Sequence, residues 1–158
     1  MPELRIEYEF NFAEGTTRAF TVLLDEHTLL CLNPLSDPPA WTRLTFEQCP
    51  HCPLHEKDHP RCPPAVNMAK IVDTFAHTPS IEDVEVVVHT PQREFRKPAG
   101  FQAGLSSLVG LIMVTSGCPI LDNLRPMAHT HLPFADARET VYRAASTYLL
   151  AQYFRLRK

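Results

Sequence analysis

The residues best suited to chemistry lie between positions 49 and 63, where the chain reads CPHCPLHEKDHPRCP. This stretch holds three of the five cysteines and three of the eight histidines of the chain. It offers almost no apolar side chains to a hydrophobic core. Thiolate and imidazole groups are the ligands that zinc and iron prefer. The stretch, called the cysteine loop below, therefore predicts a metal site.

Two short ligand pairs make up the first candidate set. Cys49 and Cys52 have the two-residue spacing of a zinc chelate, and His59 and Cys62 repeat it within the same loop. Together these four residues supply a complete tetrahedral zinc set. The alternative is a polar loop that carries cysteines by coincidence, but two chelates this close favour a metal. Pro53 follows Cys52 and has no N–H to donate to a ligand sulfur, so a standard rubredoxin-like knuckle is not expected.

A second pattern offers a different fourth ligand. Cys49, Cys52, Cys62 and Cys118 are each followed by proline, whereas Cys31 is not. Proline is common after the cysteine ligands of iron–sulfur clusters. Cys118 therefore competes with His59: zinc favours His59, which belongs to the same loop, and an iron–sulfur cluster favours Cys118. Cys31 lies in an apolar segment and is expected to be a buried, inert thiol.

Cys118 also has a possible catalytic role. It precedes a short helix expected to begin at Pro119, and a helix N-terminus lowers the pKa of a thiol. His129 and His131 follow closely and are candidates for a Cys–His nucleophilic pair. Packing and helix capping explain the same cysteine more simply, so both interpretations stay open.

The elements that must position these residues alternate in type. Residues 3–12 alternate strictly between apolar and polar side chains, as in a half-buried strand. Strands over 20–24 and 28–32 would complete an antiparallel meander, with a short strand over 41–46 leading into the cysteine loop. A second hairpin is predicted from 84–88 and 93–97.

Three main helices are predicted from apolar spacing and end signals. They cover residues 65–76 behind Pro63 and Pro64, 101–113 before Gly117, and 137–154 behind a capping box at Asp136. Gly104 and Gly110 weaken the second helix and suggest a close approach by another element. The last helix is expected to bury Val141, Ala145, Tyr148 and Leu149. The predicted fold class is therefore α+β, with the meander and second hairpin packed against three helices and the cysteine loop clamped by metal.

Composition limits the function classes. At 158 residues the chain fits one domain, 1–158, with a full core, and its apolar fraction of 44% is ordinary. The net charge of -3 disfavours nucleic-acid binding. The most apolar run, residues 105–114, is too short to span a bilayer, and no signal peptide is evident. An odd cysteine count without an export signal favours ligands over disulfides and a cytoplasmic location.

Several motifs together resemble an uncharacterised bacterial protein family of unknown function. The segments that carry the resemblance are 49–54 (CPHCPL), 59–63 (HPRCP), 115–119 (TSGCP) and 131–134 (HLPF), with LDEHTL from residue 24 and WTRL from residue 41. The resemblance covers nearly the whole chain and implies a bacterial origin, but no activity.

The function expected from these residues is a cytoplasmic metal-binding module, with zinc as the metal and an interaction or regulatory role toward a protein partner. The alternative is a redox- or thiol-dependent sensor or enzyme, using an iron–sulfur cluster or Cys118. No feature of the sequence indicates an oligomeric state.

Overall fold

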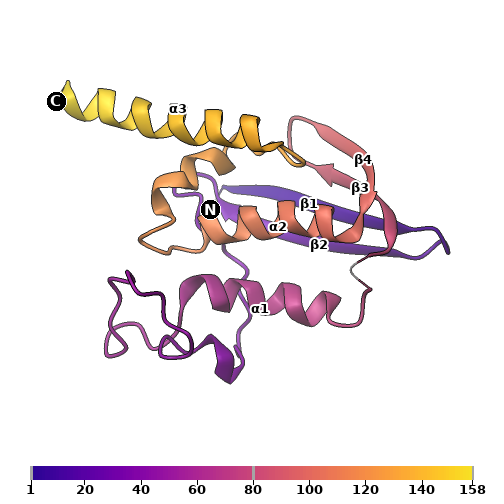
Figure 1. Cartoon of the computed structure of the whole chain (residues 1–158), viewed down its shortest axis with the longest axis horizontal. Helices are drawn as coiled ribbons and strands as arrows, with labels where there is room; N and C mark the ends of the chain where they lie inside the picture. Colours follow the sequence, from indigo (N-terminus) through magenta and orange to yellow (C-terminus); the bar gives the residue numbers. More distant parts are fainter. Residues whose placement is uncertain (1, 80, 158) are drawn as a thin grey trace.

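The computed structural model describes residues 2–79 and 81–157 and has an α+β fold, as predicted. Four antiparallel strands form one sheet in the order β2-β1-β3-β4. Three α-helices and two 3-10 helices complete the described part of the chain (Figure 1). The strands are β1 (Glu3–Phe12), β2 (Thr17–Asp25), β3 (Asp83–His89) and β4 (Glu94–Gly100); the helices are η1 (Ala40–Thr42), α1 (Pro63–Phe75), α2 (Phe101–Thr115), η2 (Asp122–Ala128) and α3 (Ala137–Leu156).

The alternation seen in the sequence of β1 is confirmed. Ile6, Tyr8, Phe10 and Phe12 are buried, whereas the residues between them remain partly exposed. Successive side chains of a strand point to opposite faces, so one face of the sheet carries the core. Helices α1 and α2 lie side by side against this face (Figure 1).

An aromatic cluster joins the sheet to both helices. The ring of Phe10 in β1 packs edge-on against Phe75 of α1 and Phe101 of α2, with centroids 5.2 and 5.1 Å apart. Phe75 and Phe101 also contact each other, at 5.4 Å. Each edge-to-face pair stabilises the fold by about 0.5–1.5 kcal/mol beyond the contribution of burying the rings. The cluster therefore fixes how the two helices sit on the sheet.

Helices α1 and α2 run in opposite directions (Figure 1). The start of α1, next to Cys62, therefore lies at the same end of the pair as the finish of α2 at Thr115. Gly117 ends this region with a positive φ of 85°, which glycine adopts without strain.

The predicted third strand is wrong. Residues 28–32 make only an isolated bridge to β2, between Leu24 and Cys31, and the second neighbour of β1 is β3. Beyond the bridge, the Asn33 side chain replaces a strand: its Oδ1 accepts from the Leu23 N–H at 3.1 Å and its Nδ2 donates to the Thr21 carbonyl at 2.9 Å. The N-terminal meander is therefore a two-stranded hairpin.

Two smaller predictions also need correction. The stretch 41–46 is not a strand, because η1 and an isolated bridge between Arg43 and Arg61 occupy its place. The short helix expected at 119–124 is instead the 3-10 helix η2, which begins at Asp122 and includes Pro126. Cys118 is therefore not its N-cap residue.

The predicted position of the last helix is confirmed, but the predicted burial of its apolar side chains is wrong. Its capping box is present, with Asp136 accepting from the Glu139 N–H at 2.8 Å. However, none of its described residues is buried, and Val141, Tyr148 and Leu149 are 67%, 54% and 64% exposed. Apolar residues surround the whole helix, so no single stripe directs one face to the core. The far end of α3 extends beyond the sheet (Figure 1). No helix within the described ranges is both long and apolar enough to cross a membrane.

Two glycines of α2 give a matched test of this packing. A Cβ at Gly104 would lie 2.7 Å from Val86 Cγ2 and 2.9 Å from Phe10 Cε1, whereas one at Gly110 would meet nothing within 4 Å. We expect Gly104→Ala to lower the free energy of unfolding by about 1–3 kcal/mol through overpacking. Gly110→Ala should raise it by up to about 1 kcal/mol, because alanine favours a helix. Urea unfolding of both variants measures the difference, and equal stabilisation would contradict the close approach.

Candidate functional site

The base of the cysteine loop is closed by a short ladder. The Cys62 N–H donates to the Thr42 carbonyl at 2.8 Å, and the Leu44 N–H donates to the Pro60 carbonyl at 3.0 Å. Thr42 and Leu44 are buried, so this ladder attaches the loop to the body of the molecule. The Arg61 guanidinium reinforces it by donating to Thr42 Oγ1 at 2.6 Å.

Within the loop, the first cysteine pair occupies a tight turn. The Cys52 N–H donates to the Cys49 carbonyl at 3.0 Å, and the Gln48 side chain donates to the Leu54 carbonyl at 3.0 Å. Cys49 is exposed and Cys52 is partly buried, and both are free thiols. The turn keeps the backbones of the two cysteines close together.

Cys118 reaches the cysteine loop from the other half of the chain. It follows the end of α2, which lies beside the start of α1, and Cys62 is the residue that precedes α1. The Cys118 carbonyl accepts from the N–H groups of Leu121 and Asp122, which fixes its backbone. The antiparallel helix pair thus brings two cysteines 56 positions apart in the sequence to one end of the molecule.

The electrostatics of Cys62 show the same convergence. Burial raises the pKa of the Cys62 thiol, the Ala65 N–H lowers it, and negative charge on Cys118, Cys49 and Cys52 raises it further. Charge interactions weaken with distance and are largely screened beyond about 10 Å. The influence of all three thiols on Cys62 therefore places the four Cys-Pro cysteines in one neighbourhood.

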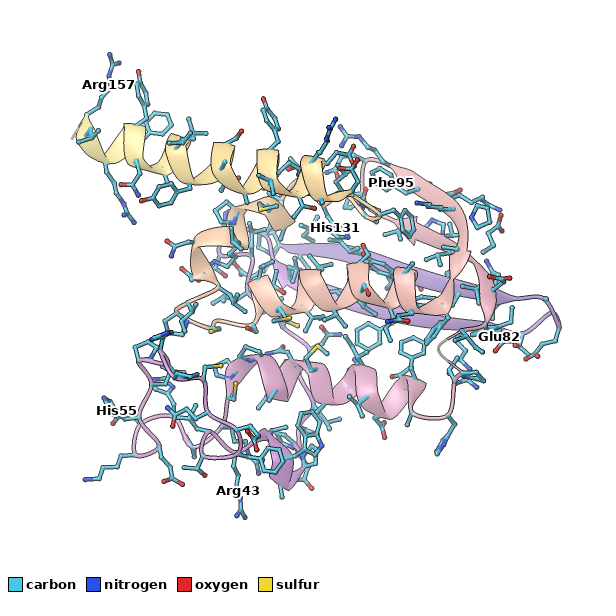
Figure 2. All side chains as sticks on the ribbon, viewed as in Figure 1. Arg43, His55, Glu82, Phe95, His131 and Arg157 are labelled. Carbon is cyan, nitrogen blue, oxygen red and sulfur yellow. The ribbon has the colours of Figure 1, made fainter. Side chains whose placement is uncertain are left out.

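This neighbourhood is looser than a coordination sphere. Among residues 2–79 and 81–157, no group of three or more His, Cys, Asp or Glu side chains is close enough to hold a metal ion. The His59 side chain is exposed, and its backbone N–H donates to the His55 carbonyl at 2.9 Å. His55 lies at the outer edge of the loop (Figure 2). The described residues therefore do not support the predicted metal clamp, and the hydrogen bonds of these residues include none between the His59 side chain and a cysteine.

Cys31 and the proposed Cys–His pair have different surroundings. Burial raises the pKa of the Cys31 thiol, and its backbone N–H donates to the Thr115 carbonyl at 2.9 Å, which fits a structural role.

The predicted Cys–His pair is not formed by a hydrogen bond among the described residues. His131 is hydrogen-bonded to Tyr8. The hydrogen bonds of the described residues include none between Cys118 and either His129 or His131.

A second candidate site lies between α2, η2 and α3, where sequence reasoning predicted none. It is a cavity of about 370 Å³ with mostly apolar walls. His131 lies in the space between α2 and α3 (Figure 2) and lines the cavity. The other polar lining groups are Ser106, Ser107, Thr140 and Arg143.

A buried polar network forms one side of this cavity. The Tyr8 hydroxyl lies 2.5 Å from His131 Nε2 and 2.9 Å from Ser107 Oγ. Burial raises the pKa of Tyr8, so this phenol keeps its proton. Burial, and then the charge of Arg143, lower the pKa of His131 to about 4, so this imidazole is neutral at pH 7. When the Tyr8 hydroxyl donates to His131 Nε2 and accepts from Ser107 Oγ, both neighbouring side chains have a hydrogen-bond partner.

Arg143 is the charged group of the cavity. Its Nη2 donates to the carbonyls of Met127 at 3.0 Å and Thr130 at 2.6 Å, which ties α3 to the end of η2. The ion pairs within the described ranges do not include Arg143. Burial lowers the pKa of its guanidinium and the charge of Glu139 raises it.

The sequence carried only faint signals of this second site. Tyr8 continues the apolar alternation of β1 and looks like an ordinary core aromatic. His131 stands in the HLPF segment, which contributed to the family resemblance but had no assigned role. Arg143 is one of several basic residues in the last helix.

The buried His131 predicts acid sensitivity. Its folded pKa of about 4 lies below the ordinary 6.5, so stability is complete above pH 6.5 and decreases as the pH falls toward 4. The loss should reach roughly 3 kcal/mol at 1.36 kcal/mol per pKa unit. Urea unfolding between pH 4 and 7 measures it. His131→Gln should flatten this dependence and His129→Gln, at an exposed position, should not; a wild-type slope in His131→Gln would contradict the assignment.

Comparison with known proteins identifies the family but adds no function. No curated protein and no solved structure matches the chain. The chain does match the family described as Domain of unknown function (DUF6901) over residues 6–158, which is almost its whole length. The protein therefore belongs to the DUF6901 family.

Proposed function

We propose that this protein is a metal-binding module whose ligands are the thiolates of Cys49, Cys52, Cys62 and Cys118, with zinc as the metal. The observation that supports the proposal is that negative charge on Cys49, Cys52 and Cys118 acts on Cys62, which precedes α1 at the end of the helix pair where α2 finishes. Three of these cysteines come from the cysteine loop and the fourth from the opposite half of the chain.

The chemistry of the donor set fits the metal. Four soft thiolates are a common structural zinc set, completed in a closed tetrahedral site. Without a cation, ionised thiolates at these positions would repel one another, since negative charge on each neighbour disfavours ionisation of Cys62. A divalent cation would remove that repulsion. His59 is the alternative fourth ligand, but it is exposed and hydrogen-bonded through its backbone to His55.

The bound metal would act as a cross-link. The cysteine loop has few apolar contacts of its own beyond the ladder at Thr42 and Leu44. A metal shared by the loop and Cys118 would hold that loop against the C-terminal end of α2. The role that follows is interaction or regulation: the metal fixes the shape of an exposed polar loop that a protein partner recognises.

An iron–sulfur cluster is the second candidate, and it rests on one observation. Each of the four cysteines is followed by proline, a residue common after cluster ligands. A redox or sensing role would replace the structural one. Protein purified anaerobically would be brown with a cluster and colourless with zinc, so absorption spectroscopy and elemental analysis separate the two.

Metal content of single variants tests the ligand set. Cys118→Ser should lose at least half of the bound zinc, because it removes one of four ligands, whereas His59→Ala should retain it. Cys31→Ser is the matched control, since it changes a cysteine outside the set. Zinc is measured by elemental analysis of gel-filtered protein. Full retention of zinc in Cys118→Ser together with loss of zinc in His59→Ala would show that His59 is the fourth ligand.

Removal of the metal should loosen one part of the molecule. Metal binding contributes directly to folding when its ligands are not otherwise held together. The sheet and its helices bury their own core, so we expect local opening and a lower melting temperature, not complete unfolding. Limited proteolysis after chelation should cut within residues 45–60 first. An unchanged melting temperature and digestion pattern after verified metal removal would argue against the cross-link.

A further inference from the structure

The cavity between α2, η2 and α3 has the character of a small-molecule site. Its volume of about 370 Å³ falls within the roughly 300–1,000 Å³ that is usual for such sites. Apolar side chains form most of the wall, and the larger ones come from α2, from η2 and from the segment that follows η2. They include Leu111, Val114, Leu124, Met127, Leu132 and Phe134. Walls of this kind accept a hydrocarbon body and exclude a strongly polar one.

Two of the polar groups of the lining lie near each other. Arg143 and His131 are close enough for the guanidinium charge to act on the imidazole. Arg143 is partly buried and takes part in none of the ion pairs of the described residues. Its hydrogen bonds to Met127 and Thr130 use Nη2, and other N–H groups of the fork remain for a ligand. The Glu139 carboxylate acts on this guanidinium without forming an ion pair, because it accepts a hydrogen bond from the Asp136 N–H in the capping box. A guanidinium with no ion-paired carboxylate beside an apolar space favours an anionic ligand.

His131 supplies a second donor. Tyr8 keeps its proton, and Nε2 is the ring atom that its hydroxyl contacts. If Nε2 accepts from Tyr8, the neutral ring carries its proton on Nδ1, an assignment inferred from the hydrogen-bond network. Nδ1 has no hydrogen bond among those of the described residues, so its N–H is available to an acceptor.

We propose that this cavity binds a small amphipathic carboxylate. The carboxylate lies against Arg143 and His131, and the hydrocarbon chain lies along α2 toward Gly110 and Val114. Charge selects the head group, because an amine would face the Arg143 cation. The size of the cavity limits the chain to a medium-length acyl group. This site is separate from the four cysteines and does not depend on a bound metal.

A series of three probes with one hydrocarbon chain tests the proposal on the full-length wild-type protein. Octanoate, 1-octanol and octylamine differ only in the head group, and titration followed by ¹H–¹⁵N NMR gives both affinity and location. We expect octanoate to bind about tenfold more tightly than octanol, as one charge-assisted hydrogen bond provides. Octylamine should bind most weakly. The shifted amides should belong to α2, η2 and the first turns of α3.

Variants distinguish the contribution of the Arg143 charge to binding from the contribution of the apolar cavity. Arg143→Gln should abolish the preference for octanoate over octanol, and Arg143→Lys should restore part of it. Arg138→Gln, which removes an exposed cation of the same helix, should leave the preference unchanged. Gly110→Phe should weaken all three probes by at least tenfold, because its Cβ meets no atom within 4 Å and the ring would fill the space.

Other results would overturn the proposal. Equal affinity of octanoate and octanol for the wild type would mean that the cavity is apolar and does not recognise an anion. This comparison uses only the wild-type protein, so it does not depend on the folding of any variant. Binding that survives in Gly110→Phe, with shifts on the outer residues of α3, would mean that the probes adhere to its exposed apolar surface. Absence of binding by every probe at millimolar concentration would also reject the site.

Discussion

The contact between Phe10, Phe75 and Phe101 is the interaction on which the rest of the molecule depends. Phe10 stands near the C-terminal end of β1, and the other two rings end α1 and begin α2. Three rings within 5.4 Å of one another leave little freedom in the placement of the helices. They fix the C-terminal end of α1 beside the N-terminal end of α2. The opposite ends, with Cys62 and Cys118, must then lie together as well.

The same constraint shapes the cavity. Once one side of α2 is committed to the sheet and to α1, its remaining side faces η2 and α3. Small residues there, including Ala103 and Gly110, leave space that larger side chains would occupy. Tyr8 reaches this side from β1 because its ring is part of the core while its hydroxyl extends to Ser107 and His131. One helix therefore positions both candidate sites, with the thiols at its end and the cavity along its flank.

Sequence reasoning worked where a local pattern is decided by local physics. The alternation of β1, the two prolines that begin α1 and the capping box at Asp136 each predicted an element that is present. Prediction from the sequence failed where contacts with residues distant in the chain determine the local structure. The segment 28–32 has the composition of a strand, but the Asn33 side chain takes up the neighbouring backbone groups instead. The predicted burial of α3 is wrong because its apolar residues lie all around the helix and none of them reaches the core. Among the site residues, the cysteines carry their own chemical signal. Tyr8, His131 and Arg143 become a site only when the fold brings together residues 123 and 135 positions away from Tyr8 in the sequence.

The amide of Asn33 has a further effect on the sheet. Strand β2 is an outer strand, and exposed outer strands invite pairing with other chains. The Asn33 side chain already bonds to Leu23 and Thr21, and the Leu32 N–H bonds to the Leu23 carbonyl. At the opposite edge, β4 contains Pro98, which has no N–H to offer a further strand. Both edges thus offer fewer free backbone groups to a further strand, which disfavours extension of this four-stranded sheet by another chain.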